Sequence, residues 1–199
     1  MKKIYTVFAS IVLIITYSFR QESQEGLARV NKVQGIEVYI LSEPLRDYEV
    51  ISDVSNGINA TSAVTGGMVN ESIADKASNF VRRAMKENSR IDAVVYSSGK
   101  RVVGIRFKDA ATPQTKGIAR VKKVNGFDTY ILAEPLKDYE VLANKGGGIK
   151  WKSYLTGGLI NNSIEDDVEK LVKKLQGNGT SIDGIIYSAG KSASGFRYR

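Results

Sequence analysis

The chain has 199 residues, of which 42% are hydrophobic, and this excludes the disordered and fibrous classes in favour of one or two globular domains. Its formal charge of +8 favours binding to an anionic partner. However, Lys and Arg alternate with Asp and Glu along the chain, and the sequence has no run of basic residues that would form a basic arm. Cysteine and histidine are absent, which excludes disulfides, thiolate nucleophiles and every site that needs an imidazole. The sequence therefore predicts no metal site and no cofactor.

The amino terminus has the pattern of a secretory signal peptide. Lys2 and Lys3 precede an apolar run over residues 4–15, and polar sequence follows from Arg20. The apolar run is shorter than the roughly 20 residues that a spanning helix needs. We therefore predict a signal peptide over residues 1–18, export to the periplasm or cell surface, and no stable membrane span after cleavage. Export also argues against a nucleic-acid partner.

An internal repeat organises the rest of the chain. Residues 26–108 align without a gap on residues 117–199, and 36 of the 83 paired positions are identical. A period this long indicates a duplicated domain rather than a solenoid repeat. We predict an N-terminal linker at 19–25, two α+β repeats at 26–108 and 117–199, and a polar linker with a proline at 109–116.

The first half of each repeat predicts strands. In the first repeat these cover residues 29–33 and 36–41, which flank Gln34-Gly35, and the second repeat has Asn125-Gly126 at that turn. Asn-Gly between apolar runs favours a type I′ hairpin, because both residues tolerate a positive φ. A third strand is predicted at residues 48–54, after the turn at Pro44.

A helix and a second hairpin complete each repeat. Ser72, with Asp75 three residues later, predicts a helix start, and Ser163 and Asp166 repeat the pattern. Apolar residues follow at spacings of three and four in both copies: Ile73, Ala77, Phe80, Val81 and Ala84, then Ile164, Val168, Leu171, Val172 and Leu175. Residues 91–96 and 102–107 then predict a hairpin.

The order in each copy is therefore β-β-β-α-β-β. We predict the α+β class, with an antiparallel sheet in each repeat, one helix on one face of that sheet, and the two repeats packed as a pseudo-twofold pair.

Basic and aromatic residues recur at matching positions and are the candidate ligand-binding set. They would present guanidinium and ammonium groups to an anionic polymer and tyrosine rings to sugars. The alternative is that the tyrosines are ordinary strand residues and the cations protect sheet edges. The set comprises Arg29, Tyr39, Tyr96, Lys100 and Arg106 with Arg120, Tyr130, Tyr187, Lys191 and Arg197.

Carboxylates give a competing hypothesis. Asp47 and Glu49 lie two apart, on one face of a predicted strand, and could serve acid–base chemistry. With Asp92 and Lys100 they define a hydrolase hypothesis, repeated in the second copy by Asp138, Glu140 and the other equivalents. The alternative is a turn-flanking Asp and a solvent-facing Glu, since two acids alone lack the clustered oxygens of a cation site.

The stretch Tyr48-Glu49-Val50-Ile51, followed by a helix and then Ile91-Asp92-Ala93-Val94-Val95, resembles small bacterial envelope α/β proteins of the YbjQ-like and dodecin-like groups. Ser52 and Ala143 stand where those groups have glycine. The resemblance implies an envelope-located oligomerising or sensing module and transfers no catalytic residue.

Export, duplication and the missing catalytic chemistry lead to one functional expectation. The chain is expected to be a non-enzymatic binding or interaction module of the bacterial envelope, with an anionic or glycan ligand, an envelope polymer or a protein as its partner. The hydrolase described above and a structural, self-associating envelope protein are the alternatives.

Overall fold

The computed structural model describes residues 24–54, 73–97, 101–142, 149–150, 168–169, 172–173, 181–187 and 192–199. The predicted signal peptide lies outside them. No helix among these residues is long and apolar enough to cross a membrane.

Both repeats contribute strands in the same order. The first repeat contains β1 (Leu27–Val30), β2 (Lys32–Val33), β3 (Ile36–Ile40), β4 (Ser42–Pro44), β5 (Tyr48–Asp53), α3 (Ile73–Glu87), β6 (Ala93–Ser97) and β7 (Arg101–Phe107). The second contains β8 (Ile118–Val121), β9 (Lys123–Val124), β10 (Phe127–Ile131), β11 (Ala133–Pro135), β12 (Tyr139–Val141), β13 (Ile149–Lys150), β14 (Gly184–Tyr187) and β15 (Ser192–Tyr198).

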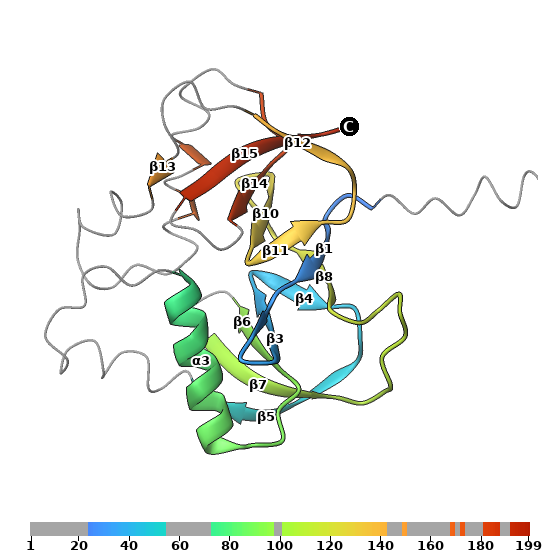
Figure 1. Cartoon of the computed structure of the whole chain (residues 1–199), viewed down its shortest axis with the longest axis vertical. Helices are drawn as coiled ribbons and strands as arrows, with labels where there is room; N and C mark the ends of the chain where they lie inside the picture. Colours follow the sequence, from blue (N-terminus) through green and yellow to red (C-terminus); the bar gives the residue numbers. More distant parts are fainter. Residues whose placement is uncertain are drawn as a thin grey trace, which may run out of the picture.

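These strands form two sheets, and each sheet contains strands of both repeats. The larger runs β12-β15-β14-β10-β3-β6-β7-β5, with β2, β9 and β13 paired beside it. The smaller runs β11-β1-β8-β4 and lies between the two ends of the larger one (Figure 1). The strand order of each sheet is symmetric. Reading it backwards and replacing each strand by its equivalent in the other repeat gives the same order. The seam between the repeats is therefore a set of strand pairs.

The predicted fold class is wrong. Two α+β domains, each with its own antiparallel sheet and helix, would keep their strands separate, but β4 pairs with β8 and β1 pairs with β11. Nor are the sheets purely antiparallel, because β3 pairs in parallel with β6 and β10 with β14. Strands dominate, and α3 is the one helix whose bounds the described residues give. Periodicity identifies strands, but it carries no information on which distant strand becomes the neighbour.

The second predicted helix falls mostly outside the described residues. Four of its residues, Val168, Glu169, Val172 and Lys173, are described and are helical. Val168 and Val172 are buried in the same core cluster as the apolar stripe of α3.

Several local predictions are confirmed. Gln34 and Gly35 have φ values of 53° and 83°, and Asn125 and Gly126 have 51° and 87°, as a type I′ turn requires. The predicted stripe of α3 is buried. A Cβ on Gly104 of β7 would lie 2.8 Å from Ile91 Cγ2 and closer still to Ser52 Oγ, so only glycine fits there.

Both faces of the larger sheet carry a buried cluster, so alternate residues of a strand pack into different clusters. On β3, Val38 and Ile40 belong to the cluster under α3, whereas Tyr39 belongs to the cluster between the two sheets. Successive side chains of a strand point to opposite faces. Glu37, two residues before Tyr39, therefore points toward the smaller sheet as well.

A strained leucine takes the chain from one sheet into the other. Leu41, between β3 and β4, has a φ of 49°, and Leu132 has the same value in the second repeat. This conformation costs a residue with a Cβ about 1–2 kcal/mol. The Leu41 amide donates to Tyr96 O at 3.0 Å, and its carbonyl accepts from the Lys122 amide at 2.8 Å. Burial of the leucine side chain offsets the strain.

Candidate functional site

The strand β3 and its equivalent β10 each carry an acid followed two residues later by a tyrosine, on the face toward the smaller sheet. In β3 these are Glu37 and Tyr39, and in β10 they are Asp128 and Tyr130; all four are buried. Each acid lies beside the glycine that precedes the first strand of the other repeat, Glu37 beside Gly117 and Asp128 beside Gly26. Two related polar sites therefore lie at the seam between the repeats.

The first seam site comprises Glu37, Tyr39, Arg46 and Phe107. The Tyr39 hydroxyl donates to Glu37 Oε2 at 2.7 Å. Burial, followed by the hydrogen bond to Glu37, raises the pKa of Tyr39 far above its ordinary value. The phenol thus stays a donor at any physiological pH and holds the carboxylate in place.

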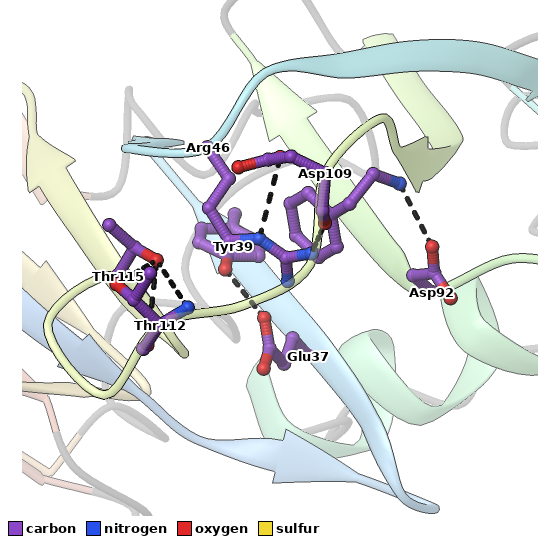
Figure 2. Close-up of polar contacts among 8 residues, drawn as sticks. Glu37, Tyr39, Arg46, Asp92, Asp109, Thr112 and Thr115 are labelled. Atoms are coloured by element: carbon purple, nitrogen blue, oxygen red, sulfur yellow. Dashed lines mark hydrogen bonds and ion pairs between the residues drawn. The ribbon is translucent and has the colours of Figure 1, made fainter.

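Arg46 covers the first seam site. Its guanidinium lies 3.7 Å from the centroid of the Phe107 ring, a cation–π contact. It also donates to the backbone carbonyl of Asp109. Figure 2 shows Arg46 beside Asp109 and the Tyr39 hydroxyl pointing toward Glu37. The arginine side chain is only 9% exposed.

One nitrogen of Arg46 lacks a hydrogen-bond partner. Its Nε is buried, and the N–H group donates to no atom of the part of the chain that the structure describes. The nearest anion is Asp109 Oδ1 at 3.9 Å, which is too far for a hydrogen bond. Buried N–H groups are nearly always paired, because an unpaired one costs about 1–3 kcal/mol.

An open pocket of about 260 Å³ lies at this site. It is smaller than the roughly 300–1,000 Å³ of drug-sized sites, so it suits a small metabolite or one group of a larger ligand. Two cations and three carboxylates line it, a formal sum of −1. Its lining residues are Lys32, Gly35, Glu37, Arg46, Asp92, Phe107 and Asp109.

The second seam site comprises Asp128, Tyr130, Lys137 and Tyr198. Tyr198 stands where the first repeat has Phe107, and its added hydroxyl donates to Asp128 Oδ2 at 2.7 Å. The Tyr198 hydroxyl oxygen also lies 2.6 Å from the Tyr130 hydroxyl and accepts from the Gly26 amide at 3.3 Å. Burial is the main cause that raises the pKa of Tyr130 to about 12 and the pKa of Tyr198 still further.

Lys137, the equivalent of Arg46, lies over the equivalent aromatic ring but has a close ion-pair partner. Its ammonium donates to Glu25 Oε1 at 2.6 Å and lies 4.9 Å from the Tyr198 ring centroid. Asp128 Oδ1 accepts no hydrogen bond from any described residue, but it lies 3.5 Å from Lys123 Nζ. The groups of the second seam site therefore pair mainly with one another.

The carboxylates of the hydrolase hypothesis have structural partners. Asp92 Oδ2 accepts from the Phe107 amide at 2.8 Å, and Asp183 repeats this bond with the Tyr198 amide at 2.8 Å. Glu49 forms an exposed ion pair with Arg106 across β5 and β7. Asp92 is the member of that set that lines the pocket. Asp47, Glu49 and Asp92 therefore do not line one pocket together.

The predicted tyrosines are core residues. Tyr39 and Tyr130 lie in the cluster between the sheets, and Tyr96 and Tyr187 lie in the cluster under α3. The ring of Tyr96 stacks on Phe80, with centroids 5.7 Å apart. None of the four rings presents an exposed face, since each residue is at most 3% exposed.

The predicted cations are dispersed over the surface. Arg29 and Arg120 are exposed on β1 and β8, opposite Glu134 and Glu43 in the strand register. Arg197 donates to the Ser181 carbonyl at 3.0 Å, and Arg106 pairs with Glu49 as described above. Lys100 and Lys191 lie outside the described residues. The structure does not bring these residues together.

Sequence reasoning missed Glu37, Arg46, Phe107 and Asp109. A signal for Glu37 was present, because an acid inside an otherwise apolar strand recurs as Asp128 in the second copy. No comparable signal marks Arg46, since exposed turns commonly carry arginine.

Among the described residues, no three acids gather closely enough to hold a metal ion. Comparisons of the chain with protein-family models, with curated proteins and with solved structures gave no match.

Proposed function

We propose that this protein is an exported, non-enzymatic binding module of the bacterial envelope, and that the first seam site holds an anionic group of its ligand. Export rests on the signal-peptide pattern of residues 1–18. The single observation that carries the binding proposal is Arg46, a nine-tenths buried guanidinium that lines an open pocket and has an unpartnered Nε.

The surroundings of Arg46 support binding to a carboxylate or phosphate oxygen. Stacking on Phe107 fixes the plane of the guanidinium, so little side-chain entropy is lost when an oxyanion docks. Lys32, on the neighbouring hairpin, lines the same pocket and adds a second positive charge. Hydrogen bonds between ionised groups are short and about twice as strong as neutral ones.

Isothermal titration calorimetry with propionate, glucuronate and inorganic phosphate tests the proposal. We expect saturable binding of at least one of these anions at one site, and a loss of about tenfold or more in affinity in Arg46→Gln. Arg46→Lys keeps the charge but loses Nε and should also bind weakly. The matched control is Lys137→Gln at the equivalent position of the second repeat, which should bind as the wild type does.

Three results would contradict the proposal. One is the absence of binding by all three anions; another is equal binding by wild type and Arg46→Gln. The third is turnover: hydrolysis of ester or glycoside substrates that is lost in Asp92→Asn would favour the hydrolase hypothesis, because Asp92 lines this pocket. Urea unfolding of each variant shows whether a change in binding reflects a change in folding.

A further inference from the structure

The charges of the pocket narrow the class of ligand. The two cations and three carboxylates that line it sum to −1, so a simple anion docked at Arg46 faces more negative than positive charge. A ligand that brings its own positive charge removes that repulsion. We infer that the ligand is a small zwitterion, with its carboxylate on Arg46 and its ammonium on the carboxylates of the same pocket.

Free acceptor oxygens are available for the ammonium. In the hydrogen bonds described, Glu37 uses Oε2 for Tyr39 and Asp92 uses Oδ2 for the Phe107 amide. Glu37 Oε1 and Asp92 Oδ1 thus keep their lone pairs, and Asp109 adds an exposed carboxylate. An ammonium has three donors and no acceptor, so several carboxylate oxygens around one pocket match its chemistry.

The positions of these groups are fixed by the fold. The buried Tyr39 hydroxyl restrains Glu37, and the backbone amide at the end of β7 restrains Asp92. Restrained acceptors favour binding because less entropy is lost when a ligand arrives.

This inference rests on the proposed function and is tested by a ligand series in the intact protein. Calorimetry compares α-alanine, β-alanine and 4-aminobutyrate, which differ in charge separation, with propionate and propylamine, which each carry one charge. We expect at least one zwitterion to bind about tenfold or more tightly than both single-charge compounds. The ratio of that zwitterion's affinity to propionate's should fall toward one in Glu37→Gln.

A control variant and three further outcomes distinguish the zwitterion inference from the anion site of the proposed function. Glu140→Gln, which changes a partly exposed acid on β12, should keep the wild-type ratio. If propionate binds as tightly as every zwitterion, the inference fails and the anion site stands. If no compound binds, the proposed function fails together with the inference. Should Glu37→Gln fold poorly in urea unfolding, Asp109→Asn removes an exposed carboxylate of the same pocket and must also lower the ratio.

Discussion

The two seam sites occupy equivalent positions of a duplicated chain, yet their hydrogen bonds differ. In the first, Glu37 reaches the Tyr39 hydroxyl directly, and Phe107 carries no polar atom. In the second, the shorter Asp128 is linked to Tyr130 through the Tyr198 hydroxyl. One methylene fewer on the acid accompanies one hydroxyl more on the aromatic ring. The exchange preserves the link between the acid and the strand tyrosine.

The neighbouring cation differs between the two sites as well. Arg46 stacks on Phe107 and leaves Nε without a hydrogen bond, whereas Lys137 extends to Glu25 and completes an ion pair. The first seam site therefore keeps a donor without a hydrogen-bond partner among the described residues, and the second pairs its polar groups with Glu25 and Gly26 near the amino terminus. Duplication supplied two copies of one arrangement, and a few side-chain differences give the two copies different hydrogen bonds.

The largest expected difference between the sites is in stability. Tyr198→Phe removes a hydrogen bond to a carboxylate, an acceptor for the Gly26 amide and the partner of Tyr130. We expect a loss of about 3 kcal/mol in the free energy of unfolding, against about 1.5 kcal/mol for Tyr39→Phe, which removes a single bond. Urea denaturation measures both. Tyr139→Phe, in which no described hydrogen bond is lost, is the control, and equal losses at Tyr198 and Tyr39 would contradict the comparison.

A double-mutant cycle tests whether acid length and ring hydroxyl compensate each other. Phe107→Tyr adds a hydroxyl where the longer Glu37 already reaches Tyr39, and Glu37→Asp shortens the acid out of reach of Tyr39. Each single change should be destabilising, and the double variant should be about 1 kcal/mol more stable than the sum of the two predicts. Additive effects in urea denaturation would show that the two differences arose independently.

The smallest expected effect concerns the ion pair of the second seam site. The hydrogen bond and charge of Lys137 lower the pKa of Glu25 below its ordinary value of 4.5. Because the folded pKa is the lower one, any stability from this pair is present above pH 4.5 and is lost as the pH falls through the folded pKa. Carboxyl NMR titration should show the pKa of Glu25 rising toward 4.5 in Lys137→Gln. An unchanged titration curve would mean that the pair does not form in solution.

The sequence determined the local structure of this protein. Asn125-Gly126, two residue types that tolerate a positive φ, and Gly35 of the equivalent turn specify the hairpins, and apolar spacing specifies α3 and its buried stripe. These features depend on residues within a few positions of one another. For that reason they could be predicted without knowing the rest of the fold.

Only the tertiary structure decided which strands are neighbours and where the site lies. The parallel pairing of β3 with β6 and the exchange of β4 and β11 between the repeats join segments far apart in the chain. Arg46 and Phe107 meet for the same reason. Such pairings depend on how two sheets and a helix together bury the most apolar surface, and one strand's pattern is compatible with many neighbours. Glu37 could be recognised as unusual from its place in an apolar strand, but its role required the partner across the seam.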